Sequence, residues 1–208
     1  MRKRFKRCWC KQAPFLFKKN IVLAIKIIQK GKLLLSEPSL LQDVTFGRSV
    51  ILIAEHNTKG SIGFILNKPT EYKVNDLVKE LNINFPVYKG GPVEEDNLFY
   101  IHNTPELILD SVEIADGIYW GGDFEMVIEQ ANKGNFTKKN IRFFLGYSGW
   151  IANQLEQEAN QRSWVITSNK HKSTILSKAS SSLWKNQIES LGEKYKIWSN
   201  APEDPEYN

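Results

Sequence analysis

Short, nearly continuous apolar runs bounded by turn residues dominate the hydrophobic pattern of the chain. Such runs are typical of strands. Residues 49–56 (SVILIAEH) are apolar at almost every position, which predicts a strand buried on both faces. Turn residues 57–60 follow, so residues 61–67 are expected to pair back as an antiparallel hairpin. The expected strands are 32–35, 49–56, 61–67, 87–89, 98–102, 112–114, 118–120, 141–145 and 164–166.

Apolar residues at helical spacing predict four helices between these strands. The first is expected over 76–81 after the N-cap Asn75, with Leu77 and Leu81 facing the core, and the second over 124–132 after the N-cap Asp123, with Gly134 left-handed beyond it. The third is expected over 151–159, with Ile151, Leu155 and Ala159 as its apolar stripe. The fourth is expected from Ser173 to Leu191 and is ended by Gly192. Hairpins with scattered helices predict an α+β fold: a single compact domain with a mixed, mostly antiparallel sheet and several flanking helices. A length of 208 residues suits one domain.

Charge divides the chain unevenly. Residues 1–36 carry eleven Lys or Arg and no acidic residue, whereas the remaining 172 residues carry 17 basic and 23 acidic side chains, a net charge of −6. Residues 1–30 therefore form a basic arm, expected to be disordered or to reflect a start codon assigned too far upstream. Residues 31–198 form the domain, and residues 199–208, with two prolines, form an irregular tail. Nucleic acid is expected to bind only weakly, and only through residues 1–30.

Cysteines and apolar run lengths bear on the compartment. No run approaches 18 apolar residues, and Lys18-Lys19 interrupts the longest one, so neither a membrane span nor a secretory signal is expected. Cys8 and Cys10, the only cysteines, form a C-x-C pair that lacks the second pair of a zinc site. We expect a cytoplasmic protein with no cofactor, no bound metal and no membrane partner.

Two glycine-rich segments invite a catalytic or phosphate-binding interpretation. Residues 146–150 (GYSGW) resemble the nucleophile elbow of hydrolases, but Trp150 replaces the final glycine. The favoured interpretation is a sharp turn from strand to helix that Gly146 and Gly149 permit. Residues 90–92 (GGP) lack a following Lys-Ser or Lys-Thr and are interpreted as a turn rather than a phosphate cradle.

Histidines and strand-end polar residues supply the candidate site. His56 and His102 each end an apolar strand, a placement that would allow them to converge at one edge with Glu55 or Asp116. Gln154 and Glu158 are four residues apart on one helix face, where they can line a cleft or serve as structural hydrogen-bonding groups. If a cleft exists, the side chains expected to line it are Arg48, His56, Asn67, Gln154 and Glu156.

Several phrases in a fixed order carry a family resemblance. They include GKLL (31–34), FGRSV (46–50), EH (55–56), NKP (67–69), GGPV (90–93), DGI (116–118), GYSGW (146–150), QLE (154–156) and LW (183–184). With these phrases the chain resembles the AlgH/YqgE family from about residue 31 to the C-terminus. The family helix usually starts with a glycine where this chain has Asn153, although asparagine also tolerates a positive φ. The resemblance implies a loose label of transcriptional regulator and no specific activity.

Three classes of function remain. The favoured hypothesis is a non-enzymatic binding or regulatory protein whose partner is an unknown protein or small molecule. The alternative is an enzyme that uses His56 or His102 with a carboxylate in a cleft. Direct DNA binding by the domain conflicts with its charge of −6.

Overall fold

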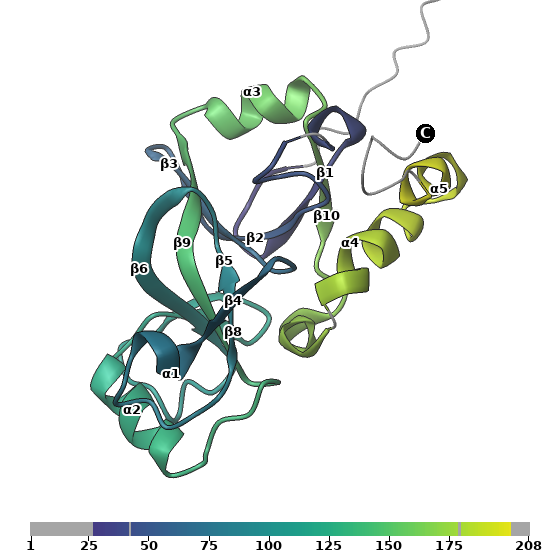
Figure 1. The fold of residues 1–208 in the computed structure, drawn as a ribbon. Coiled ribbons are helices and arrows are strands. Elements are labelled where there is room, and N and C mark those ends of the chain that lie inside the picture. Colours follow the sequence, from purple (N-terminus) through teal and green to yellow (C-terminus); the bar gives the residue numbers. More distant parts are fainter. Residues whose placement is uncertain (1–26, 42, 179, 201–208) are drawn as a thin grey trace, which may run out of the picture.

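The computed structural model describes residues 27–41, 43–178 and 180–200 (Figure 1). Most of the basic arm (1–26), both of its cysteines and most of the tail (201–208) lie outside the described residues. The strands are β1 (Lys32–Ser36), β2 (Val50–Asn57), β3 (Gly60–Ile65), β4 (Pro69–Lys73), β5 (Pro86–Lys89), β6 (Val93–His102), β7 (Val112–Ala115), β8 (Ile118–Trp120), β9 (Ile141–Ile151) and β10 (Trp164–Ser168). The helices are α1 (Val74–Leu77), α2 (Phe124–Asn132), α3 (Gln154–Asn160), α4 (Ser180–Glu189) and α5 (Glu193–Ser199), with 3-10 helices η1 (Pro38–Leu40) and η2 (Lys172–Ser177).

One ten-stranded sheet runs through the molecule in the order β10-β1-β2-β3-β9-β6-β8-β7; off this path β5 pairs with β9, and β4 pairs with β5. Strand β9 joins its two halves, because its last residues pair with β3 and its first residues pair with β5 and β6. Among the described strands the β5–β9 pair is parallel and the other pairs are antiparallel. The predicted single α+β domain with a mixed, mostly antiparallel sheet is confirmed.

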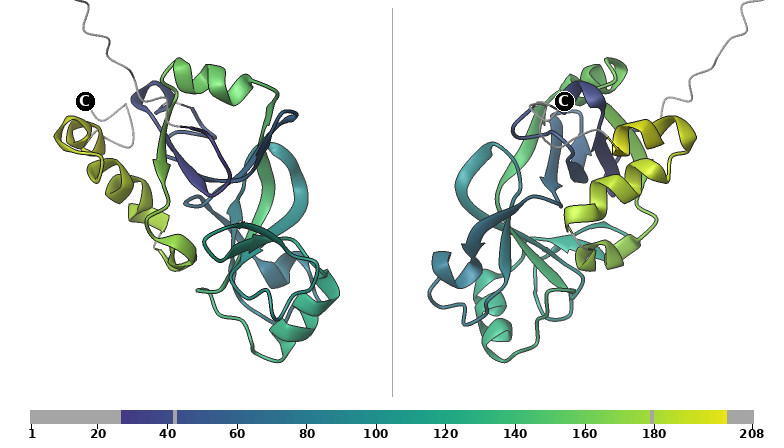
Figure 2. Two further views of the ribbon diagram at one scale, coloured as in Figure 1. Left: turned by 180° about the vertical axis from the view of Figure 1, so that it is seen from behind. Right: turned by 45° about the vertical axis from the view of Figure 1, so that its right-hand side comes forward.

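The half of the sheet that contains β1, β2 and β3 is covered on both faces (Figures 1 and 2). Alternation along the strands divides its side chains between two apolar clusters. On what we call the α4 side, Leu33 and Leu52 pack with Leu183 and Trp184 of α4. On the α3 side, Leu34 packs with residues of β2, α3 and β10: Ile51, Ile53, Leu155, Trp164 and Ile166. The prediction of a strand buried on both faces over 49–56 is thereby confirmed.

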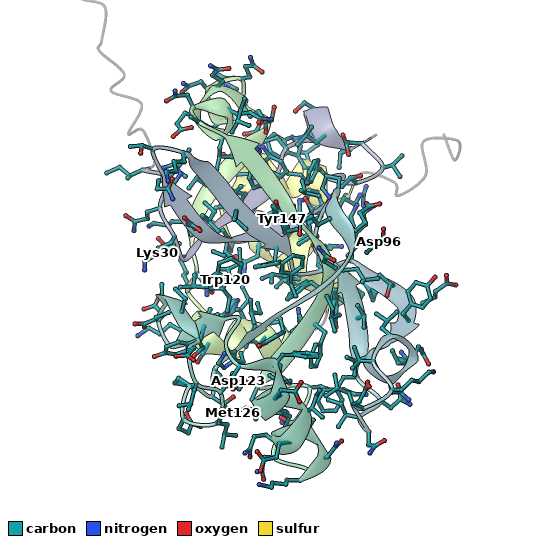
Figure 3. The ribbon with its side chains drawn as sticks, turned by 90° about the vertical axis from the view of Figure 1, so that its left-hand side faces the viewer. Lys30, Asp96, Trp120, Asp123, Met126 and Tyr147 are labelled. Atoms are coloured by element: carbon teal, nitrogen blue, oxygen red, sulfur yellow. The ribbon has the colours of Figure 1, made fainter. Side chains whose placement is uncertain are left out.

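The other half of the sheet packs against α1 and α2. Its apolar cluster includes Tyr100 of β6 and Phe143 of β9, with Val127 of α2. Aromatic rings link the halves: Tyr147 contacts Phe99, with ring centroids 5.5 Å apart, and the row continues to Phe64 and Trp120. Figure 3 labels Tyr147, Trp120 and Asp96 in one view. Asp96 belongs to residues 94–97 of β6, which lie between the positions where β6 pairs with β9.

Several local turn and capping predictions are confirmed. The β2–β3 hairpin and the β7–β8 hairpin around Asp116-Gly117 both form. The Asp123 carboxylate accepts hydrogen bonds from the backbone N–H groups of Glu125 and Met126, which caps α2 as expected. Gly134 follows this helix with a φ of 77°. These features depend on residues adjacent in sequence, which explains why the sequence predicts them.

The predicted strand-to-helix turn at Gly146–Gly149 is wrong. Strand β9 continues through this segment to Ile151 and antiparallel pairing with β3 holds it. Gly146 has a φ of 66°, and a Cβ there would lie 2.7 Å from the carbonyl oxygens of Gly91 and Val93. Gly149 is exposed and has no positive φ, so no strained turn depends on it. The turn lies instead at Asn153, whose φ of 63° begins α3.

Two predicted helices also differ from the structure. The helix expected over 76–81 is the shorter α1, preceded by Lys73 rather than Asn75, and Leu77 is 38% exposed while Leu81 is buried. The helix expected from Ser173 to Leu191 is broken into η2 and α4, and a further helix, α5, follows Gly192. Ile151, expected in the apolar stripe of its helix, is instead the last residue of β9 and is 76% exposed.

Residues 27–30 lie against the domain. Ile28 packs on the α3-side cluster, and Lys30 Nζ donates a hydrogen bond to the carbonyl of Glu113 (3.2 Å). At the other end, α5 extends to Ser199. The proposed limits of arm, domain and tail stay predictions. Within residues 27–41, 43–178 and 180–200, no helix is both long and apolar enough to cross a membrane.

Candidate functional site

Arg48 and Asn67 lie together where β2 begins and β3 has ended. The Asn67 side chain accepts from the backbone N–H of Val50 (2.7 Å) and donates to the carbonyl of Arg48 (2.8 Å). The Arg48 guanidinium carbon lies 5.5 Å from the ring centroid of Trp184 on α4. Both polar groups of the Asn67 amide are therefore used to tie two backbone segments together, and Arg48 is placed beside α4.

His56 and Glu156 meet at the other end of β2. His56 Nδ1 is 2.8 Å from Ser61 Oγ across the hairpin, and His56 Nε2 is 3.7 Å from a carboxylate oxygen of Glu156 on α3. Ser61 is 5% exposed, whereas Glu156 is half-exposed. Serine, imidazole and carboxylate thus follow one another in space, which is the residue set of a proton relay.

Gln154 and Glu158 form a hydrogen-bonding group on the α3 side. The Glu158 carboxylate accepts from the indole N–H groups of Trp150 (2.9 Å) and Trp164 (2.7 Å) and from the Gln154 amide (2.9 Å). The Gln154 oxygen in turn accepts from the backbone N–H of Ile151 (3.1 Å). The sequence left open whether Gln154 and Glu158 line a cleft or serve as structural hydrogen-bonding groups. These contacts are structural hydrogen bonds.

The five candidate cleft residues fall into two groups. Arg48 and Asn67 lie near the start of β2, while His56, Gln154 and Glu156 lie near its end. Arg48 and His56 are eight residues apart along extended chain, or about 26 Å at the rise of a strand. The structure therefore brings His56 and Glu156 together but does not bring all five side chains to one place.

His102 lies far from His56, so the two histidines do not converge at one edge. Across the sheet His56 pairs with Ser61, which pairs with Trp150 of β9, whereas His102 pairs with Ile141 at the other end of β9. Nine residues of strand separate these two positions on β9, about 30 Å along its axis.

His102 is fully buried and structurally engaged. Its Nδ1 accepts from the backbone N–H of Thr104, and its Nε2 lies 3.3 Å from the carbonyl of Gly121. These partners fit the neutral ring with the proton on Nε2. Burial lowers the pKa of His102, against smaller opposing effects of the Gly121 carbonyl and Glu106. The ring stacks on Tyr119 and serves as a neutral core group.

Ser148 does not have the setting of a hydrolase nucleophile. It is fully buried within β9, and its hydroxyl donates to the carbonyl of Gly90 (3.0 Å). That bond joins the Gly90-Gly91 turn to β9. The described part of the chain also holds no group of three or more His, Cys, Asp or Glu side chains placed to bind a metal ion.

A pocket of about 280 Å³ lies between β5, the start of β9 and the junction of η2 with α4. We call it the Arg142 pocket. Phe85, Pro86 and Tyr88 of the β5 region form an apolar wall. The polar side chains that line it come from three segments and are Lys138, Arg142, Ser177, Lys178, Ser180 and Ser181. None of the described residues that line it is acidic, so the pocket is strongly basic.

Arg142 is 5% exposed and makes its hydrogen bonds to backbone carbonyls. Its Nη1 donates to Leu66 (2.7 Å), and its Nη2 donates to Leu176 (2.5 Å) and Lys178 (3.2 Å). The guanidinium carbon also lies 4.5 Å from the ring centroid of Tyr88. A guanidinium has five N–H donors, so at least two have no acceptor among the described residues.

The charge of Arg142 has no opposite charge close by. Within the described ranges no carboxylate lies within 4 Å of its guanidinium. Burial lowers the pKa of Arg142, and the Tyr88 hydroxyl opposes that shift. Arginine nonetheless stays charged in proteins, because its ordinary pKa lies far above the physiological pH range. A permanent positive charge therefore lines the pocket, and at least two of its five donors have no acceptor among the described residues.

The site was not predicted from the sequence, although the sequence contains one signal for it. Arg142 interrupts the apolar run IRFFL at residues 141–145. Alternation places Arg142 on the α4 side together with Phe144, while Ile141 and Phe143 face the α2 cluster. A single charged residue in an otherwise apolar central strand indicates a buried charge, and hence a candidate site.

Comparison with known proteins identifies the family. The sequence profile described as AlgH-like matches residues 33–196. The chain belongs to the AlgH-like family. A UPF0301 protein of Bacteroides thetaiotaomicron is 41% identical over 181 residues, which cover 86% of this chain and 91% of that protein. A UPF0301 protein of Cytophaga hutchinsonii is 44% identical over 184 residues, covering 88% of this chain and 100% of that protein. The predicted family resemblance is confirmed.

Solved structures support the same fold for the AlgH-like chain. The solution structure of the AlgH protein from Pseudomonas aeruginosa aligns with a TM-score of 0.64 and 22% identity, covering 83% of this chain and 93% of that one. A crystal structure of a Corynebacterium diphtheriae protein gives a TM-score of 0.65 and 18% identity, covering 84% and 93% of the two chains. At these identities the likeness concerns the fold alone.

Proposed function

We propose that this AlgH-like chain is a non-enzymatic binding protein and that a small anionic ligand occupies the Arg142 pocket. One observation carries the proposal. Arg142 is 5% exposed and lines the pocket, and its guanidinium has carbonyl partners but no carboxylate partner among the described residues.

The energetics of burial support this proposal. A buried charge without a counter-charge costs several kcal/mol, and carbonyl groups offset only part of that cost. A bound anion supplies the missing charge and accepts from the free guanidinium N–H groups. Charge-assisted hydrogen bonds of this kind are stronger than neutral ones.

The lining of the pocket favours binding over catalysis. Its serine hydroxyls belong to Ser177, Ser180 and Ser181, and the described lining pairs none of them with a histidine or carboxylate. The Ser177 hydroxyl donates instead to the carbonyl of Thr174 (2.8 Å). These groups offer hydrogen bonds and positive charge, which are what an anion requires for binding.

A binding measurement with matched variants tests this proposal. Acetate, succinate, citrate, sulfate and phosphate are titrated at constant ionic strength against the parent chain and two double variants. One variant, Lys138→Gln with Lys178→Gln, removes two charges from the pocket. The control, Lys139→Gln with Lys172→Gln, removes two charges from exposed neighbours in the same segments. We expect at least one anion to bind the parent and the control and to bind the pocket variant about tenfold more weakly. Equal binding to all three proteins, or no binding, would contradict the proposal.

The His56 group supports a second candidate, an enzyme that uses His56 as acid or base. The supporting observation is its position between Ser61 Oγ at 2.8 Å and Glu156 at 3.7 Å. A fluorophosphonate probe tests it, because an activated Ser61 would be labelled and His56→Gln would prevent labelling. Ser148, buried and bonded to the Gly90 carbonyl, serves as the internal control. If Ser61 is not labelled, this second candidate is contradicted and anion binding remains the proposed function.

A further inference from the structure

We infer that the ligand of the Arg142 pocket is a phosphate group, carried either as inorganic phosphate or as a small phosphate monoester. This inference rests on the proposed binding function and specifies its ligand class.

Hydrogen-bond donors reach the pocket from three separate segments. Arg142 comes from β9, Lys138 comes from the turn that precedes it, and Ser180 and Ser181 come from the first turn of α4. Donors spread over several directions match the tetrahedral oxygens of phosphate. A carboxylate, in contrast, is planar and is commonly bound by one arginine fork.

The start of α4 contributes a further set of donors. The first backbone N–H groups of any α-helix lack partners within the helix, and the helix dipole places partial positive charge there. Helix α4 has ten residues, and its first two, Ser180 and Ser181, line the pocket. The helix start alone would not indicate a ligand. The buried guanidinium of Arg142 beside it is the independent observation, and phosphate is the anion that such a combination commonly binds.

Charge favours a dianion over a monoanion. Arg142, Lys138 and Lys178 place three positive charges around the pocket, and the described lining contains no acidic residue. A phosphate monoester carries a charge of about −1.5 to −2 at pH 7, whereas a simple carboxylate carries −1. The phosphate group therefore offsets more of the local charge.

Size limits what can be attached to the phosphate. The pocket volume of about 280 Å³ is at the lower limit of the roughly 300–1,000 Å³ typical of ligand pockets. Phosphate itself or a monoester with a small organic part fits such a volume. Phe85 and Pro86 would contact the organic part.

Isothermal titration of the full chain tests the ligand class with four probes: inorganic phosphate, glycerol phosphate, sulfate and succinate, all at equal ionic strength. We expect one of the two phosphates to bind about tenfold more tightly than succinate. That phosphate should lose about tenfold in affinity in the Lys138→Gln, Lys178→Gln variant and less than about twofold in the Lys139→Gln, Lys172→Gln control. Tighter binding of glycerol phosphate would identify the monoester as the source, and tighter binding of inorganic phosphate would identify the free ion.

Amide exchange provides a second measurement that needs no variant. The Leu176 and Lys178 carbonyls already accept from Arg142, so a phosphate bound there would join β9 to the start of α4. We expect saturating phosphate to slow exchange over residues 180–184 at least about threefold, with no change in α2. Unchanged exchange over residues 180–184 would contradict phosphate binding at this place.

The outcomes separate this inference from the function on which it rests. If succinate binds as tightly as both phosphates and depends on the pocket lysines, the phosphate inference is overturned and the binding function stands. If no anion depends on the pocket lysines, both are overturned. If phosphate binds the pocket variant and the control equally, binding is nonspecific and the phosphate inference is overturned.

Discussion

Glu158, which is partly buried, and Arg142, which is buried, are two charged side chains that neutral groups hold, one on the α3 side and one on the α4 side of the sheet. The Glu158 carboxylate accepts from two indole N–H groups and one amide. The Arg142 guanidinium donates to three backbone carbonyls and keeps at least two donors without an acceptor among the described residues.

Glu158 and Arg142 differ in how many of their hydrogen-bonding groups have partners within the fold. One Glu158 oxygen accepts from Trp150 and Trp164, which belong to the α3-side core, and the other accepts from Gln154 on the same helix. Arg142 lines a pocket together with lysine and serine side chains. A charge whose hydrogen-bonding capacity its neighbours use stabilises the fold, whereas a buried charge that lines a pocket and keeps unused donors can bind a ligand.

The largest expected effect is on Glu158. Replacing Glu158 with alanine leaves the indole N–H groups of Trp150 and Trp164 without their acceptor. Each buried donor that loses its partner costs about 1–3 kcal/mol, so we expect the free energy of unfolding in urea to fall by about 2–4 kcal/mol.

The matched control for this change is Gln157→Ala, an exposed position on the same helix, which we expect to change stability by less than about 0.5 kcal/mol. Glu158→Gln should lie between the two, because its amide oxygen still accepts. If Glu158→Ala were no worse than Gln157→Ala, Glu158 would not be the structural centre of the α3 side.

A smaller loss is expected for Arg142→Met measured without added anions. The substitution removes three hydrogen bonds to carbonyls but also removes a charge that is costly to bury. We expect a loss of about 1–2 kcal/mol in urea unfolding, below that of Glu158→Ala. A loss larger than that of Glu158→Ala would show that Arg142 is chiefly structural and would remove the distinction between the two charges.

How far the sequence predicts each region follows from the range of the interactions involved. The capping of α2 by Asp123 and the hairpin at Asp116-Gly117 depend on neighbours in the chain, and both were predicted correctly. The course of β9 through Gly146 depends on the backbone of residues 91–93, more than fifty positions away, and local signals gave a turn instead.

The same reasoning applies to the candidate site. His56 and Glu156 were both among the predicted cleft residues, because each lies near the end of its element. The Arg142 pocket was not predicted, since its partners Leu176 and Lys178 follow 34 and 36 residues later, at a helix break that the periodic pattern conceals. The anomaly of one arginine in an apolar strand was visible, but its partners were not.

His102 differs from Glu158 and Arg142, because it is a titratable side chain that the fold keeps neutral. Its contribution to stability therefore depends on pH. Burial holds its folded pKa below the unfolded value of about 6.5. Below pH 6.5 the unfolded chain therefore binds a proton that the folded chain does not, and the stability present above that pH is lost as the pH falls toward the folded pKa. We expect the free energy of unfolding to decrease as the pH is lowered from 7 to 5.

Comparing pH slopes isolates the contribution of His102. His102→Gln should flatten the dependence between pH 7 and 5, whatever its effect on stability at pH 7. His171→Gln is the control, because His171 is far less buried, although burial lowers its pKa too. A slope equally steep in His102→Gln would assign the dependence to other groups.

The smallest expected effect is on the stability of the Lys138→Gln, Lys178→Gln variant. This variant should lose anion binding without losing stability. Lys138 and Lys178 are exposed, line the Arg142 pocket and have no ion pair within 4 Å in the described part of the chain. Replacing both with glutamine in anion-free buffer should change the free energy of unfolding by less than about 0.5 kcal/mol, as for most exposed positions. A slight gain in stability is the favoured direction, since two like charges near Arg142 are removed. Urea unfolding beside the Lys139→Gln, Lys172→Gln control measures it. A loss above about 1 kcal/mol in the pocket variant alone would mean that these lysines support the fold, like Glu158, and would undo the contrast from which the binding function was argued.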